Sequence, residues 1–251
     1  MQTTSVQVPT ADGAADAYLV KPDGDGPFPG VLMFMDAFGL RPRLAEMAER
    51  IAERGYAVLV PNLFYRSARP PLVSAEELTN DEKRGAAFGR LMPMIQQLTP
   101  ARIVADTDSY LDFLAAQPGV AAGPVLAVGY CMGGRAGLRA MAGRPARIKA
   151  LAAFHAGGIV TDDPESVHLS VGSITGEVYF GFADHDRSMT AEQIKTLEAA
   201  LDDAGVTYTC EVYEGAAHGF TMSDTAVYDA AAEQRHWTNL FALLDRALPV
   251  S

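Results

Sequence analysis

The chain has 251 residues, enough for one α/β domain with a large buried core, and 49% of them are apolar. Acidic residues outnumber basic ones 31 to 20, and the formal charge of −11 argues against nucleic-acid or anionic-membrane partners. The start of the chain lacks a basic segment followed by an apolar run. We therefore expect no signal peptide, free cysteine thiols and a cytoplasmic location.

The predicted elements begin with two strands joined at Asp12-Gly13, a favourable turn pair. Short apolar runs then alternate with helical patterns, as is typical of βαβ units. We predict one α/β domain over residues 1–251, with a mostly parallel central sheet covered by helices on both faces. The expected strands are 5–9, 15–20, 30–35, 56–60, 125–128, 148–154, 177–182 and 207–213, and the expected helices are 44–55, 101–117, 132–142, 191–204 and 230–248.

The strongest motif is Gly-Tyr-Cys-Met-Gly-Gly at residues 129–134, between a predicted strand and a predicted helix. Its glycines permit the tight turn on which a nucleophile sits in a G-x-C-x-G elbow. The turn aims the sulfur of Cys131 at the N-terminus of the following helix, whose partial positive charge favours a thiolate. We expect Cys131 to be a nucleophile and Cys210, inside a strand, to be a core residue.

A nucleophilic thiol needs a general base, and the base needs a carboxylate to orient it. On this type of turn the chain order is nucleophile, acid, histidine. His218 lies in a glycine-bracketed loop after the last strand and is the expected base, whereas His155 is expected to line the pocket. Asp184 comes first after the preceding strand and is the expected acid, with Asp186 as the alternative. No metal-binding motif is present, so we expect no metal and no cofactor.

Two backbone N–H groups should stabilise the oxyanion that forms during ester cleavage. The elbow places Met132 in this role, and the loop after the first long strand contributes Ala37. Asp36 lies beside that donor, where it would either hold the Cys131 proton in the resting enzyme or cap the loop. Apolar residues near the strand ends, Phe38 among them, should form core and an adaptable pocket wall.

With these motifs the chain resembles the dienelactone hydrolase (carboxymethylenebutenolidase) family of the α/β-hydrolase superfamily over nearly its whole length. The cysteine elbow is the most specific part of the resemblance, because most α/β-hydrolases carry serine there. The resemblance implies the α/β-hydrolase fold and a triad of Cys131, Asp184 and His218. It also places Asp36 where the family has a glutamate that contacts the resting cysteine. The segments that carry it are residues 35–39, 55–58, 61–66, 129–134, 183–185 and 217–220.

The resemblance further implies that Arg84 is one of two arginines that hold a substrate carboxylate. A family tyrosine four residues later is Phe88 here, and the position of the second arginine is Met222. Losing one cation predicts a preference for less anionic or bulkier substrates. Asp36 and Phe38 complete the expected substrate-binding residues.

The expected reaction is hydrolysis of a small ester or lactone through a covalent acyl-enzyme. Substrate would free Cys131 from Asp36, and His218 would take the proton. One alternative is a non-catalytic protein that binds esters or lactones. A thiol redox protein is a weaker alternative, because no resolving cysteine lies near Cys131. The sequence is compatible with a monomer or a small homo-oligomer, and it leaves open whether residues 67–99 form a lid.

Overall fold

Eight strands form one sheet in the computed structural model, which describes residues 1–250. They are β1 (Gln2–Thr10), β2 (Gly13–Lys21), β3 (Gly30–Phe34), β4 (Ala57–Pro61), β5 (Val125–Tyr130), β6 (Ile148–Phe154), β7 (Glu177–His185) and β8 (Tyr208–Ala217). Their order is β1-β2-β4-β3-β5-β6-β7-β8. β2 pairs antiparallel with β1 and β4, and all other neighbours are parallel. The prediction of a mostly parallel sheet is confirmed.

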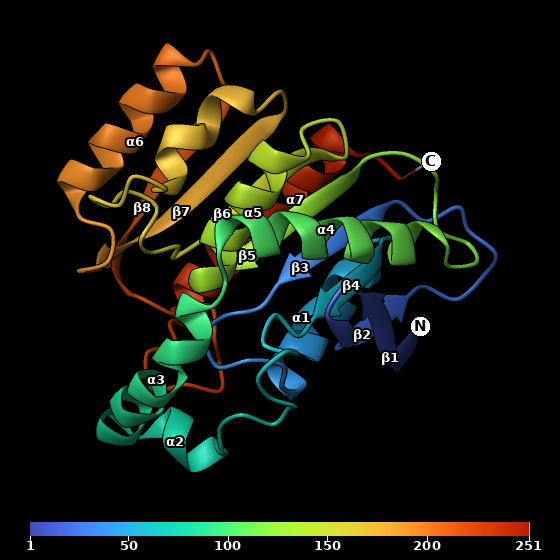
Figure 1. Cartoon of the computed structure of the whole chain (residues 1–251), viewed down its shortest axis with the longest axis horizontal. Helices are drawn as coiled ribbons and strands as arrows, with labels where there is room; N and C mark the ends of the chain where they lie inside the picture. The colour runs from blue at the N-terminus through green and yellow to red at the C-terminus, as the bar shows by residue number, and fades with distance from the viewer. Residues whose placement is uncertain (251) are drawn as a thin grey trace.

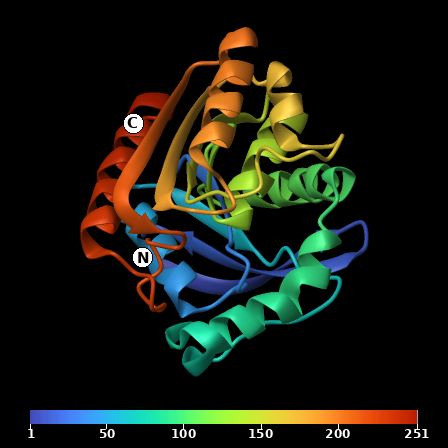
Figure 2. The same ribbon diagram turned by 90° about the vertical axis from the view of Figure 1, so that its left-hand side faces the viewer.

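Helices cover both faces of this sheet (Figure 1). They are α1 (Pro42–Ala52), α2 (Ala75–Thr79), α3 (Asp81–Gln96), α4 (Pro100–Ala115), α5 (Met132–Gly143), α6 (Ala191–Asp203) and α7 (Ala230–Ala247), with the short 3-10 helix η1 (Val167–Ser173). The turned view places α4, α5 and α6 on one face and α7 on the other (Figure 2). α1 lies beside α7, where the Arg50 guanidinium is 4.4 Å from the Trp237 ring centroid. None of the helices in residues 1–250 has the length and apolar character that crossing a bilayer requires.

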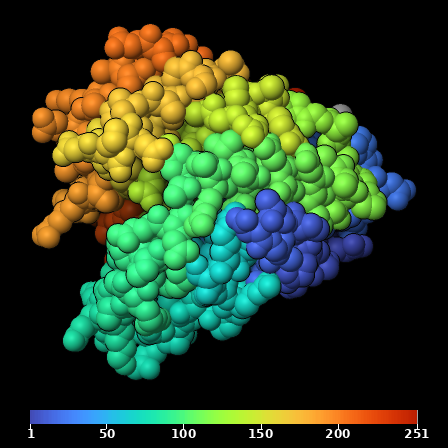
Figure 3. Space-filling model, viewed as in Figure 1, coloured from blue at the N-terminus to red at the C-terminus, as the bar shows by residue number. Residues whose placement is uncertain are grey.

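Two helices, α2 and α3, lie in residues 67–99, which the sequence pattern left without predicted elements. The Ser74 hydroxyl accepts a hydrogen bond from the Glu77 N–H, and the Glu77 carboxylate accepts one from the Ser74 N–H, which is a capping box. Asn80 caps α3 by accepting from the Lys83 N–H. The pair projects from the rest of the molecule in the ribbon and space-filling views (Figures 1 and 3).

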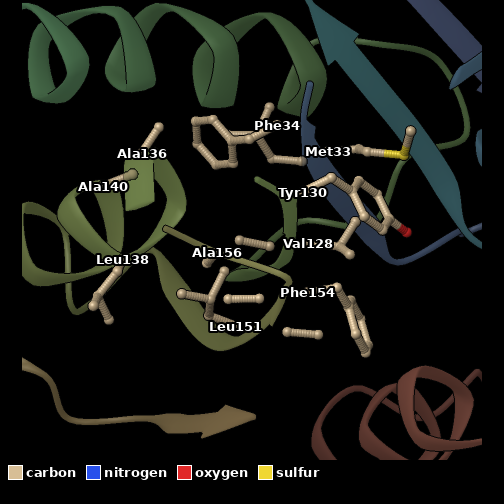
Figure 4. Packing of buried hydrophobic residues seen from close by; sticks show 14 of the residues in the cluster. Met33, Phe34, Val128, Tyr130, Ala136, Leu138, Ala140, Leu151, Phe154 and Ala156 are labelled. Carbon is tan, nitrogen blue, oxygen red and sulfur yellow. The ribbon is translucent and has the colours of Figure 1, made fainter. Parts of the chain in front are cut away.

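The helix α5 packs on the middle of the sheet, against β3, β5 and β6. Figure 4 shows side chains of β3, β5 and β6 packed with those of α5. The strands here are buried on both faces, so they read as continuous apolar runs in the sequence. The turn between β5 and α5 is therefore held by a rigid support.

Two histidines are fully buried in this region. Nε2 of His236, on α7, is 3.0 Å from the Tyr130 hydroxyl, and Nε2 of His155, after β6, is 2.8 Å from the Thr221 hydroxyl. Burial lowers the pKa of His236 to about 3 and lowers the pKa of His155 well below its ordinary value. Both rings are therefore neutral in the folded protein at neutral pH.

The two neutral rings predict how stability depends on pH. As pH falls through about 6.5, these two histidines bind protons in the unfolded chain and remain neutral in the folded protein. Each histidine should then lower the free energy of unfolding by about 1.4 kcal/mol per pH unit. His236→Gln should remove the contribution of one histidine, about 1.4 kcal/mol per pH unit, from the slope of unfolding free energy against pH. Urea unfolding between about pH 5 and pH 6.5 measures this slope. A slope that stays the same in His236→Gln would show that His236 is already protonated in the folded state.

Candidate active site

The turn between β5 and α5 holds Cys131 in an unusual conformation, with φ of 55° and ψ of −121°. Such positive φ is rare in non-glycine residues and is found at functional turns. A Cβ at Gly129 would lie 2.3 Å from the Gly133 carbonyl oxygen, and one at Gly133 would lie 2.4 Å from the Phe34 carbonyl oxygen. The prediction that this elbow requires its glycines is confirmed by these close backbone approaches.

His218 links the elbow to a carboxylate. Its Nε2 is 2.9 Å from the Cys131 sulfur, and its Nδ1 is 2.6 Å from Oδ2 of Asp186. Asp186 also accepts hydrogen bonds from the N–H and hydroxyl of Ser188, at 2.8 and 2.6 Å. Burial opposes charge on His218, but the Cys131 sulfur and the Asp186 carboxylate outweigh it and raise the pKa of His218 well above its ordinary value. The arrangement therefore favours the imidazolium form of His218 beside the Cys131 sulfur.

The expected contact between Asp184 and His218 is wrong. The Asp184 carboxylate accepts the Gly215 N–H at 2.9 Å, and its side chain is 39% exposed, compared with 4% for Asp186. The cause is the length of β7, which continues to His185 and includes a register shift against β8 near its end. Asp186, rather than Asp184, is therefore the first carboxylate beyond the strand.

The expected oxyanion donors, Ala37 and Met132, both line the pocket beside Cys131. Within residues 1–250, no acceptor takes a hydrogen bond from either N–H. Met132 is the first residue of α5, where a backbone N–H has no partner inside the helix. Both groups are therefore available to a ligand oxygen.

Asp36 is paired with Arg41 rather than with the thiol. Its Oδ1 and Oδ2 lie 2.7 and 2.8 Å from the two terminal nitrogens of Arg41, and its Oδ1 accepts the Phe38 N–H at 3.0 Å. Arg41 also donates through Nε to Asp224, in the loop that follows His218, at 2.5 Å. Both charges of the Asp36–Arg41 pair are buried. Asp36 therefore caps the loop after β3 that carries Ala37, which we call the oxyanion loop. Through Arg41 it also links this loop to the loop that follows His218.

A pocket of about 560 Å³ opens above these groups. α3 forms one wall with Arg84 and Phe88, and the surface is hollowed beside this projection (Figure 3). Of the ten site residues expected from the sequence, Asp184 alone is not part of the lining. The nine that line the pocket are Asp36, Ala37, Phe38, Arg84, Phe88, Cys131, Met132, His218 and Met222.

Two arginines that were not expected from the sequence, Arg135 and Arg187, also line the pocket. Arg135 lies four residues after Cys131 on the helix that follows the elbow, so the i, i+4 spacing would have placed it on the same helix face. His155 lines the pocket as expected, and its ring centroid is 5.4 Å from that of His218. Met92 and Ile95 extend the apolar wall that α3 provides.

Known proteins of similar sequence and structure agree with this architecture. The profile of the dienelactone hydrolase family matches residues 15–248. A relative from Synechocystis sp., provisionally named a carboxymethylenebutenolidase, is 27% identical over 99% of this chain and 98% of its own. The structure named m3DLH is 27% identical with a TM-score of 0.80, covering 100% of this chain and 99% of that one. A provisionally named dienelactone hydrolase from Klebsiella pneumoniae is 24% identical with a TM-score of 0.82, covering 96% and 97%.

The sheet order and the elbow between β5 and α5 define an α/β-hydrolase. Within that superfamily the chain belongs to the dienelactone hydrolase family. It is a carboxylic ester or lactone hydrolase.

The choice between the two aspartates predicts a sharp difference between two isosteric variants. Asp186→Asn should lower kcat for nitrophenyl acetate by about 10³- to 10⁴-fold, because it removes the charge that stabilises the imidazolium of His218. Asp184→Asn is the matched control and should keep activity within about threefold. Circular dichroism should show both variants folded. A larger loss in Asp184→Asn would restore the original assignment.

The Arg41 pairing predicts that Asp36 does not restrain the thiol. Asp36→Asn should leave the rate of Cys131 alkylation by iodoacetamide, without substrate, within about twofold. It should lower the free energy of unfolding by about 3 kcal/mol, because Arg41 loses a buried partner. Both are measured on the same preparation. Alkylation that becomes about tenfold faster would mean that Asp36 does hold the resting thiol.

Proposed function

We propose that the chain hydrolyses small esters or lactones through a covalent thioester on Cys131, with His218 as base and Asp186 as its orienting acid. The observation that supports this most directly is the continuous chain of contacts from sulfur to imidazole to carboxylate, at 2.9 and 2.6 Å. A nucleophile, a base and an orienting carboxylate in this order are the parts that acyl transfer requires.

The first half of the proposed reaction forms the thioester. The thiolate of Cys131 attacks the carbonyl carbon, and the N–H groups of Ala37 and Met132 stabilise the oxyanion. When the oxyanion collapses, the bond to the alkoxide leaving group breaks, and the imidazolium of His218 donates its proton to that oxygen. From a lactone, the new hydroxyl stays attached to the acyl group.

The second half releases the acid. His218 takes a proton from a water molecule, and the hydroxide attacks the thioester carbon. The carbon–sulfur bond then breaks, and the thiolate and imidazolium are regenerated. Asp186 keeps Nδ1 protonated throughout, so that Nε2 faces the reacting atoms. No external oxidant or reductant is needed.

This mechanism differs from the sequence-based expectation in how the thiol is activated. Because both oxygens of Asp36 bind Arg41, the proposed resting state needs no substrate to release Cys131. The sulfur already contacts Nε2 of His218. The nucleophile and its base are therefore already in contact before substrate enters.

We propose one catalytic domain acting in the cytoplasm on a small molecule, as a monomer or small homo-oligomer. The two free thiols support a reducing compartment. One cluster of buried residues that extends from Val8 to Ala247 supports the single domain.

The two cysteines provide a matched pair for testing the nucleophile. Cys131→Ala should lower turnover of nitrophenyl acetate and of a neutral lactone by about 10³-fold or more. Cys210→Ala, which removes the other thiol, should leave turnover unchanged. An acid quench followed by intact-mass measurement should detect an acetyl adduct on the wild type and none on Cys131→Ala. Tight lactone binding without turnover by the wild type would favour the non-catalytic alternative.

A further inference from the structure

His155, the residue that follows β6, has a strained backbone. Its φ is 38°, and within residues 1–250 only one other non-glycine residue, the nucleophile Cys131, has a positive φ. The His155 N–H donates to the Gly181 carbonyl oxygen of β7 at 2.7 Å. Three residues later, the Gly158 N–H donates to the Ser188 carbonyl oxygen at 2.8 Å. Such strain persists only where the surrounding structure holds it, and it is concentrated at functional sites.

The ring of His155 contacts three residues of the loop that carries the base. Its centroid is 5.4 Å from that of His218 and 5.0 Å from that of Phe220, with interplanar angles of 62° and 80°. This is the edge-to-face arrangement in which aromatic rings attract each other. The Nε2 atom of His155 is 2.8 Å from the Thr221 hydroxyl. One side chain therefore holds both ends of the segment from His218 to Thr221.

His155 acts on this loop through contact and not through proton transfer. Burial lowers the pKa of His155, and the nearby His218 acts in the same direction. A neutral ring packs against the His218 imidazolium without the repulsion that a second cation would cause. Nδ1 of His155 has no hydrogen-bond partner within residues 1–250, so the Thr221 hydroxyl supplies the polar contact that orients the ring.

The chain that continues from His155 lies against both the base and the acid. A Cβ at Gly157 would be 3.5 Å from Cε1 of His218 and 2.0 Å from the Ser188 hydroxyl oxygen. That hydroxyl donates to the carboxylate of Asp186 at 2.6 Å. The segment that begins at His155 therefore supports the whole contact between imidazole and carboxylate.

We propose that His155 is a positioning residue, which holds the imidazole of His218 in the orientation that reaches the Cys131 sulfur. Thr221 is its partner in this role, because its hydroxyl fixes the rotation of the His155 ring. Small displacements of a reacting group cost large factors in rate, so His155 affects turnover without touching the substrate. The effect on turnover rests on the proposed function, whereas the contact between base and sulfur does not.

Two variants remove this support from opposite sides. His155→Asn removes the ring, and asparagine is one of the non-glycine residues that best tolerate a positive φ. Thr221→Val removes the hydroxyl at nearly constant shape, and Thr221→Ser keeps the hydroxyl. The matched controls are His236→Asn, at the other fully buried histidine, and Thr107→Val, at an equally buried threonine of α4; neither residue lines the pocket.

Alkylation of Cys131 by iodoacetamide tests the positioning without any hydrolysis. An imidazolium beside a thiol favours the thiolate, which is the form that is alkylated. His155→Asn and Thr221→Val should raise the pH midpoint of the alkylation rate by about 0.5 unit or more, so that alkylation below that midpoint is at least about threefold slower. Thr221→Ser and both controls should leave the midpoint within about 0.2 unit. An unchanged midpoint in both test variants, or an equal shift in the controls, overturns the proposal.

Turnover of nitrophenyl acetate tests the consequence for catalysis. His155→Asn should lower kcat about 30-fold and Thr221→Val about tenfold, with KM within about threefold, because the support acts on the reacting groups. Thr221→Ser and the controls should keep kcat within about threefold. A raised KM at constant kcat would make His155 a wall of the pocket only, and this result also overturns the proposal. Thermal unfolding checks each variant; if His155→Asn does not fold, Thr221→Val decides alone.

The two experiments separate the two proposals. If the wild type does not hydrolyse the ester, the proposed function fails, and the alkylation midpoints still decide the role of His155. If hydrolysis depends on Cys131 but His155→Asn and Thr221→Val change neither kcat nor the midpoint, the proposed function stands and the His155 proposal fails.

Discussion

The site depends on the close backbone approach at the turn between β5 and α5. Cys131 adopts φ of 55° there, and the neighbouring glycines leave no room for a Cβ between the turn and β3. This strain persists because β5 lies between β3 and β6 in a sheet buried on both faces. The same turn fixes the sulfur position and exposes the first N–H groups of α5. Nucleophile and oxyanion donor are therefore set by one piece of backbone, which keeps their relative geometry constant.

A second constraint links the loops on either side of that turn. Arg41 binds Asp36 in the oxyanion loop and Asp224 in the loop after His218, across 183 residues of chain. The pair is buried, so breaking it would leave an uncompensated charge and is strongly disfavoured. The loop of the oxyanion donor Ala37 and the loop after the base His218 are thus both bound to Arg41. This explains how a site assembled from separate loops, which are usually the most mobile parts of a fold, can stay preorganised for catalysis.

The features that could be predicted from the sequence are those that depend on a local residue pattern. The glycines around Cys131 indicate a tight turn, and the strand before His218 indicates a loop at the edge of the sheet. The structure brings Cys131 and His218 into contact. The acid was misplaced, because the end of β7 lies three residues beyond its apolar run and no local signal marks it. The Asp36–Arg41 pair was missed because a buried ion pair depends on tertiary packing rather than on periodicity. The helices of residues 67–99 were missed because their exposed faces give a weak apolar pattern, although their caps were readable at Ser74 and Asn80.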